Sequence, residues 1–166
     1  MLRGLLTIAD SGDAPAVAAL LTAVAGELTA LHGIGHWSST ITDKNVRASM
    51  KRASVFVVRD GEGIAATLTL ATRKPWAIDR QYFTPVDRPL YLIAMAVAPD
   101  RQRTGLGRAC VAEAVEVCRD WPADALRLDA YDTAAGAGEF YRKCGFTERG
   151  RATYRNTPLI YYERLV

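Results

Sequence analysis

The spacing of apolar residues alternates between a helical period and a strand-like period, which predicts an α/β fold. One amphipathic helix is indicated by Val17, Leu20, Leu21, Val24, Leu28 and Leu31, and Gly33 supplies its expected end. A second helix is expected from residue 42 or 43 to 51. Further helices are predicted at 106–119 and 139–143, and strands at 5–8, 54–59, 64–71, 90–98, 125–131, 146–154 and 159–165.

Turn residues and breakers separate these elements. Asp60-Gly61-Glu62-Gly63 predicts a tight hairpin turn, and Asn156-Thr157-Pro158 predicts a second connection between strands. Residues 73–89 contain three prolines and are expected to be irregular. Leu90 to Ala98 is apolar throughout, so we expect a central strand covered on both faces. No repeat or linker is visible, which predicts a single domain over residues 1–166.

Composition and charge narrow the class of protein. The chain has 166 residues, of which 49% are hydrophobic and 23% charged, as in ordinary globular proteins. A net charge of +3 with scattered basic residues does not indicate nucleic-acid binding. No uninterrupted apolar run approaches a membrane span, and the apolar start is too short for a signal peptide. Cys110, Cys118 and Cys144 lack metal-ligand spacing. We therefore predict a cytoplasmic protein with no metal, membrane or nucleic-acid partner.

The stretch after the central strand carries the clearest chemistry. Pro99 ends the strand, and Gly105 and Gly107 then precede a helical pattern, with Arg101, Arg103 and Arg108 around them. A glycine turn at a helix N-terminus directs backbone N–H groups at an anion and lets a phosphate approach closely. This pattern predicts a pyrophosphate site. The Gly-Lys-Ser/Thr of a nucleotide P-loop is absent, and Cys110 stands where a dinucleotide fingerprint needs its third glycine.

The run Gln102-Arg103-Thr104-Gly105-Leu106-Gly107 resembles the acyl-CoA-binding motif Gln/Arg-x-x-Gly-x-Gly/Ala of the GNAT superfamily of N-acetyltransferases. A second similarity is Phe140-Tyr141-Arg142-Lys143-Cys144-Gly145-Phe146, which follows the predicted strand at 125–131. The order of predicted elements resembles the GNAT fold over nearly the whole chain. The resemblance implies a single mixed, mostly antiparallel sheet of about seven strands with helices on both faces.

The resemblance implies transfer of an acetyl group from acetyl-CoA to a primary amine, by direct attack in a ternary complex without a metal. It places CoA against the end of the central strand and the glycine turn, namely Ala96, Val97, Ala98, Gln102, Arg103, Thr104, Gly105, Leu106, Gly107 and Arg108. Backbone N–H groups of Ala96 to Ala98 are expected to face the pantetheine and the thioester carbonyl. Relatives commonly have Asn at the position of Ala134, so one side chain used on the pantetheine arm is missing.

Two residues are implied as catalytic groups. Tyr141 is the implied general acid, because a phenol is protonated at neutral pH and can protonate the leaving thiolate. The alternative is that its ring only packs against its aromatic neighbours. The central strand has no acidic residue, so Asp129 on the next predicted strand is the candidate base. The alternative for Asp129 is a purely structural strand carboxylate. Glu27, His36 or an ordered water are weaker candidates for the base.

The acceptor site is implied at His36, Trp37, Trp76 and Tyr131, with Leu31, His32 and Tyr82 nearby. Loop tryptophans beside histidines favour a small amine or an amino acid, although lone aromatics often only cap a core. A peptide N-terminus or a lysine side chain is the alternative acceptor. A non-catalytic acyl-CoA-binding regulatory module and a dinucleotide-dependent oxidoreductase also remain open. The enzyme is expected to be a monomer or a homodimer.

Overall fold

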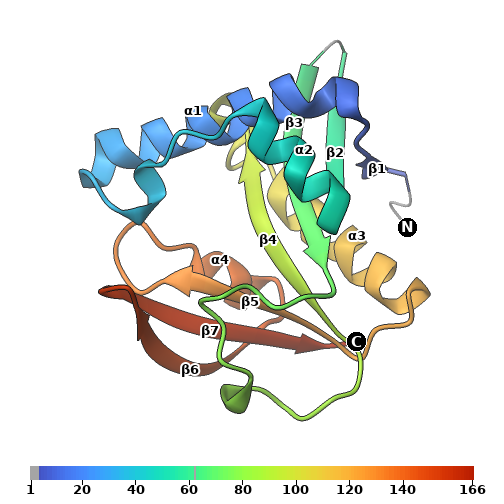
Figure 1. Cartoon of the computed structure of the whole chain (residues 1–166), viewed down its shortest axis with the longest axis vertical. Coiled ribbons are helices and arrows are strands. Elements are labelled where there is room, and N and C mark those ends of the chain that lie inside the picture. Colours follow the sequence, from blue (N-terminus) through green and yellow to red (C-terminus); the bar gives the residue numbers. More distant parts are fainter. Residues whose placement is uncertain (1–3, 62) are drawn as a thin grey trace. The chain divides into compact units, whose positions relative to one another are not determined.

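The structure is a computed structural model that describes residues 4–61 and 63–166. Within these residues, seven strands form one mixed sheet in the order β1-β2-β3-β4-β5-β7-β6 (Figure 1). The strands are β1 (Thr7–Ile8), β2 (Ser54–Asp60), β3 (Gly63–Ala71), β4 (Pro89–Val97), β5 (Ala125–Tyr131), β6 (Thr147–Tyr154) and β7 (Thr157–Leu165). The helices are α1 (Ala14–His32), α2 (Asp43–Arg52), α3 (Leu106–Asp120) and α4 (Gly138–Lys143). The predicted fold class and element order are confirmed.

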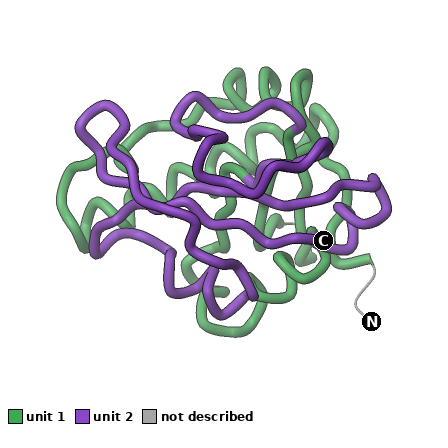
Figure 2. The backbone as a smooth tube through the Cα atoms, turned by 90° about the horizontal axis from the view of Figure 1, so that it is seen from below, with its two compact units in different colours: residues 1–71, 93–114 green, residues 72–92, 115–166 purple. Residues whose placement is uncertain are grey.

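Contacts divide the chain into two compact units (Figure 2). The first unit comprises residues 1–71 and 93–114, and the second comprises 72–92 and 115–166. Strand β4 and helix α3 each contribute residues to both units. The single domain over 1–166 therefore stays a prediction, and each unit is described by itself below.

The core of the first unit lies between α1, α2 and strand β2. Its buried members are Ala9, Ala14, Val17, Ala18, Val46, Val55 and Val57. Val55 and Val57 alternate along β2, so both point at the helices. Gly33 ends α1 at a φ of 81°, and the Thr42 hydroxyl begins α2 by accepting the N–H of Asn45. Both predicted helix boundaries are thereby confirmed.

The segment Ser11–His32, which contains α1, is long and apolar enough to cross a membrane by length and composition, with a mean hydropathy of 1.6. This segment was not predicted, because its apolar residues do not form one uninterrupted run. One such helix is weak evidence, because core helices pass the same test. In the first unit α1 buries Val17, Ala18 and Leu20. The absence of a membrane partner stays a prediction.

Strand β4 differs from its expected burial. Leu90, Tyr91 and Leu92 are buried, as predicted for a strand covered on both faces. Ala94, however, is exposed and has a φ of 50°. A positive φ in a non-glycine residue interrupts the strand's side-chain alternation, as at a β-bulge. The prediction of double burial is therefore wrong at Ala94, whereas Ala96 is buried again.

The β6–β7 turn is also displaced from its predicted place. Arg155 and Asn156 both have positive φ, 48° and 63°, and Tyr154 pairs with Thr157. This is the two-residue hairpin turn whose handedness matches the twist of the strands. Pro158 lies inside β7 rather than in the turn. In the other predicted hairpin turn, Glu62 lies outside the described residues.

All three cysteines are buried thiols that form no disulfide within the described residues. Burial raises the pKa of Cys110 to about 11 and that of Cys118 to about 12. Both thiols therefore stay protonated and unreactive at neutral pH.

A buried carboxylate ties the start of the described chain to α3 within the first unit. The two oxygens of Glu113 accept the backbone N–H groups of Gly4, Leu5 and Leu6 at 3.0, 3.0 and 3.1 Å. Glu113 is only 8% exposed, so these N–H groups give it the partners that a buried carboxylate needs.

We expect Glu113→Gln to lower the free energy of unfolding by about 1–3 kcal/mol, because an amide NH₂ would replace one acceptor and face backbone donors. Urea unfolding measures the change. Glu116→Gln is the matched control, since Glu116 lies on the same helix but forms only a surface pair with Arg119. An equal loss of unfolding free energy in both variants would contradict a stabilising role for the three hydrogen bonds to Glu113.

The second unit contains a buried ion pair that the sequence analysis did not anticipate. Arg127 on β5 and Glu163 on β7 are each 3% exposed, and Arg127 Nε donates to Glu163 Oε2 at 2.9 Å. The guanidinium also donates to the carbonyl oxygen of Thr84 and the hydroxyl of Tyr91, and lies 4.9 Å from the Phe83 ring centre. The irregular connection between β3 and β4 is thereby fixed to the strands of this unit.

Candidate active site

The predicted anion-binding turn lies in the first unit, between the end of β4 and the start of α3. A short 3₁₀ turn, η4 (Pro99–Arg101), precedes it. Arg103 and Gly105 have positive φ, 59° and 89°, and the N–H of Ala109 donates to the Gly105 carbonyl at 3.0 Å. The N–H groups of residues 106–108 precede this first helical hydrogen bond, so they have no acceptor within α3. They are positioned to receive an anion.

Side chains of the turn partly bond to the turn itself. Gln102 Nε2 donates to the carbonyl oxygen of Val97 at 3.1 Å, and the Thr104 hydroxyl donates to the carbonyl oxygen of Arg101 at 2.6 Å. Arg101 pairs with Asp60, so its charge is partly neutralised. Arg103 and Arg108 are exposed at the turn. The positive charge available to a phosphate therefore rests mainly on these last two residues.

The residues at the end of β4 meet the expectation only in part. Ala96 is buried, and Val97 and Ala98 are half-buried. The N–H of Ala98 donates to the carbonyl of Ala65 on β3 at 2.8 Å. This N–H is thus not available to a pantetheine arm, contrary to the expectation for Ala98. Binding of CoA by Ala96 and Val97 stays a prediction.

Asp129 lies on β5 of the second unit in an environment that disfavours its charge. The side chain is half-buried, and this desolvation raises the pKa of Asp129 above its usual range. Burial is the largest cause that raises the pKa of Tyr131, Tyr141 and Tyr161, and the negative charge of the Asp129 carboxylate raises each of these pKa values further. Asp129 is therefore within electrostatic reach of three phenols. A carboxylate of raised pKa is a better base than an exposed one.

Tyr141 lies on α4, also in the second unit, and is buried among aromatic rings. Its ring centre lies 5.1 Å from Phe140, 5.6 Å from Phe146 and 6.4 Å from Tyr162. The packing that the sequence offered as an alternative is thus present. Burial is the main cause that raises the pKa of the Tyr141 phenol, so the hydroxyl stays protonated at neutral pH. The ring is packed and the hydroxyl remains a proton donor.

Asp129 and Tyr141 belong to opposite faces of the strands in the second unit. Asp129 pairs directly with Tyr161, and opposed residues share a face; the Tyr161 hydroxyl bonds to Ala77 and Asp79 on that side. Tyr141 instead contacts Tyr162, the next residue on β7, which points to the other face. The candidate base and the candidate acid therefore lie on different sides of the same strands.

The predicted acceptor residues are divided between the units. His36 and Trp37 lie in the first unit, in the 3₁₀ turn η2 (His36–Ser38), where Trp37 Nε1 donates to the Gly33 carbonyl at 2.9 Å. Trp76 and Tyr131 lie in the second unit; Trp76 is 88% exposed, whereas Tyr131 is half-buried. Trp76 therefore does not cap the core.

Two further features lie in the first unit. Glu27 on α1, one of the weaker candidates for the base, has a buried Oε2 with no hydrogen-bond partner among the described residues. A cavity of about 120 Å³ lies beside Ala94. The cavity was not predicted and has no local sequence signal, because it depends on how distant elements pack. Within the described residues, no three His, Cys, Asp or Glu side chains converge to hold a metal ion.

The sequence matches the model of the acetyltransferase (GNAT) family over residues 24–146. No curated protein gives a significant match. The fold is similar to that of a ribosomal-protein-alanine N-acetyltransferase from Brucella melitensis, with a TM-score of 0.72 and 18% identity over 98% of this chain and 99% of that one.

The ribosomal-protein-S18-alanine N-acetyltransferase of Escherichia coli gives a TM-score of 0.72 at 18% identity, over 97% of this chain and 92% of that one. A putative acetyltransferase from Salmonella typhimurium, solved with acetyl-CoA, gives 0.69 at 16% identity over 96% and 92% of the two chains. At these identities the structural matches establish a shared fold.

Proposed function

Since this chain belongs to the GNAT acetyltransferase family, we propose that it acetylates the primary amine of a small molecule or an amino acid. Enzymes of this family are acyl-CoA-dependent N-acetyltransferases, and their acyl donor is acetyl-CoA. The observation that carries the donor half of this proposal is the glycine turn at the start of α3. This turn suits the pyrophosphate of CoA for three reasons. It contains residues of positive φ, its backbone N–H groups at residues 106–108 make no hydrogen bond within α3, and Arg103 and Arg108 are exposed beside it.

We expect Gly105→Val to weaken acetyl-CoA binding by more than about tenfold, which is about 1.4 kcal/mol. A Cβ at Gly105 meets no atom within 4 Å, so the new side chain projects into the open space where the anion would lie. Calorimetric titration measures the dissociation constant. Gly61→Val is the control, because Gly61 also has a positive φ, 58°, and open space around a Cβ, and so carries similar backbone strain. Unchanged affinity in a folded Gly105→Val protein would refute the assignment.

The proposed chemistry uses the two groups of the second unit. The neutral amine is the attacking form, and Asp129 accepts, directly or through a water, the proton that the nitrogen loses as the amide forms. The amine nitrogen attacks the thioester carbonyl carbon, the C–N bond forms and the C–S bond breaks. Tyr141 donates its hydroxyl hydrogen to the departing sulfur. Nitrogen loses a proton and sulfur gains one in this step, so separate basic and acidic groups are used.

A small acceptor is supported by the loop between α1 and α2. Its backbone is already bonded: the N–H of Ser38 donates to the Gly35 carbonyl, and that of Gly35 to the Ser38 hydroxyl, both at 3.0 Å. Peptide acceptors that bind as added strands need an extended, unpaired backbone. This loop instead offers side chains, among them the exposed His36. A screen of small amines against peptides with free N-termini, read as acetyl-CoA-dependent thiol release, tests the acceptor class.

The remaining parts of the proposal concern the setting. The buried cysteines, which form no disulfide within the described residues, are compatible with a reducing compartment, and we propose a cytoplasmic enzyme that needs no metal. Monomeric and dimeric forms are both compatible with the proposed reaction, and light scattering distinguishes them.

A further inference from the structure

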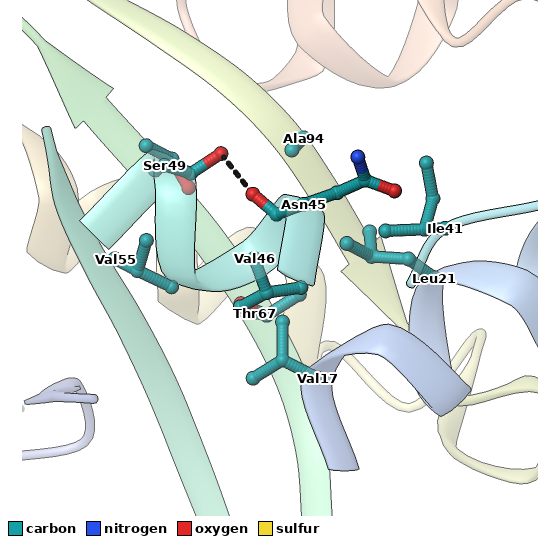
Figure 3. A pocket seen from close by; sticks show the side chains of 10 residues that line it. Val17, Leu21, Ile41, Asn45, Val46, Ser49, Val55, Thr67 and Ala94 are labelled. Atoms are coloured by element: carbon teal, nitrogen blue, oxygen red, sulfur yellow. Dashed lines mark hydrogen bonds between the residues drawn. The ribbon is translucent and has the colours of Figure 1, made fainter. Parts of the chain in front are cut away.

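A cavity of about 120 Å³ lies wholly within the first unit. Its walls come from α1, α2, the segment between them, and strands β2, β3 and β4 (Figure 3). Six of its lining residues are apolar: Val17, Leu21, Ile41, Val46, Val55 and Ala94. The four others, Asn45, Ser49, Thr67 and Thr69, are polar but uncharged. None of the residues predicted for acceptor binding lines it.

The polar groups of the lining are largely engaged elsewhere. Ser49 donates to the Asn45 carbonyl at 3.2 Å, as Figure 3 shows, and Thr67 donates to the Phe56 carbonyl at 2.9 Å. The Asn45 side-chain oxygen accepts from the backbone and the hydroxyl of Thr42. The cavity therefore presents mainly carbon to an occupant. With no carboxylate in the lining, a primary ammonium would lose its hydration there without gaining a counter-charge.

The cavity is next to the strand that leads to the CoA turn. Ala94, which lines it, is the exposed residue of positive φ in β4. The same strand continues through Ala96 and Val97 to η4 and Gly105, all inside the first unit. A thioester held along Ala96 and Val97 by a CoA anchored at Gly105 would have its acyl carbon close to Ala94.

We propose that this cavity is an acyl-chain pocket, which lets the enzyme use acyl-CoA donors with short saturated chains longer than acetyl. The inference rests on the proposed function, since it assumes CoA on the glycine turn. An apolar cavity of about 150 Å³ holds the six carbons of benzene, so this one fits four or five carbons. Donors up to butyryl-CoA or pentanoyl-CoA should therefore be accommodated, whereas octanoyl-CoA exceeds the available space.

The test is calorimetric titration of the protein with acetyl-, propionyl-, butyryl-, pentanoyl- and octanoyl-CoA. Burial of one methylene should strengthen binding about three- to fourfold, so butyryl-CoA should bind roughly tenfold more tightly than acetyl-CoA. Affinity should fall again at octanoyl-CoA. Affinity that is flat or falls from acetyl-CoA onward would overturn the pocket. Failure of every acyl-CoA to bind would instead refute the proposed function.

Two variants of Ser49 make the test specific. Ser49→Leu fills the cavity from α2, so the ratio of butyryl-CoA to acetyl-CoA affinity should fall at least tenfold. Ser49→Ala removes the same hydroxyl without filling space, and its ratio should equal that of the parent. If Ser49→Leu keeps the ratio but raises the KM of the amine, the cavity binds the acceptor, and the acyl-chain assignment is wrong. Circular dichroism checks that both variants are folded.

Discussion

A Tyr141→Phe enzyme should turn over about 10²-fold more slowly than the parent, with acetyl-CoA affinity and melting temperature nearly unchanged. The variant keeps the ring that packs against Phe140, Phe146 and Tyr162 and loses only the hydroxyl. General acids contribute about 10²–10⁴-fold. The lower end is expected here, because burial raises the pKa of Tyr141 and a thiol is already the stronger acid.

Steady-state turnover with saturating acetyl-CoA measures the effect, and Tyr162→Phe is its control. Tyr162 belongs to the same aromatic cluster and is completely buried, so the control removes a comparable hydroxyl from the same core. It should keep its turnover. A Tyr141→Phe enzyme with more than about a third of parental turnover would show that Tyr141 only packs.

Asp129→Asn should slow turnover by about 10²-fold and remove the acidic limb of the pH–rate profile, since an amide cannot accept the amine proton. Binding of acetyl-CoA should barely change. Asp132→Asn is the control: Asp132 follows β5 directly but pairs with Arg151 at the surface, so both limbs should remain. Near-normal turnover of Asp129→Asn at every pH would return Asp129 to a structural role.

The same substitution should raise stability at neutral pH. Burial raises the pKa of Asp129 in the folded state above its unfolded value, so the folded protein binds this proton more tightly. The stabilising contribution is present below the unfolded pKa and is lost as pH rises through the folded pKa. Above that range the charged carboxylate costs free energy, which Asn avoids. Thermal unfolding from pH 4 to pH 8 should therefore show a gain for Asp129→Asn only at the upper end.

Most helices and strands could be predicted from the sequence, because short stretches of residues determine them. Apolar periodicity and turn residues predicted the strands and helices, and β5 was placed over 125–131 as observed. The glycine turn could also be recognised, because glycine at Gly105 matches a φ of 89°. Pro158 misled the placement of the last turn, since proline is tolerated near the start of a strand.

The remaining features depend on contacts between distant residues. The positive φ of Ala94 has no signature in an alanine, and the engagement of the Ala98 N–H depends on Ala65, far away in the chain. Arg127 lies between leucines with nothing nearby to mark its partner, Glu163. The cavity combines five elements and one connecting segment. Such features follow from packing and could not be read from any single window of sequence.

The buried pair of Arg127 and Glu163 also limits how this sequence can diverge. Removing one partner leaves an uncompensated buried charge, at a cost of about 3–5 kcal/mol. That is a large fraction of the about 5–15 kcal/mol that stabilises a typical domain. Replacing both by apolar residues of similar volume can be neutral. Descendants of this chain should therefore keep both residues or replace both together. A substitution at only one of the two positions should be rare in the evolution of the enzyme.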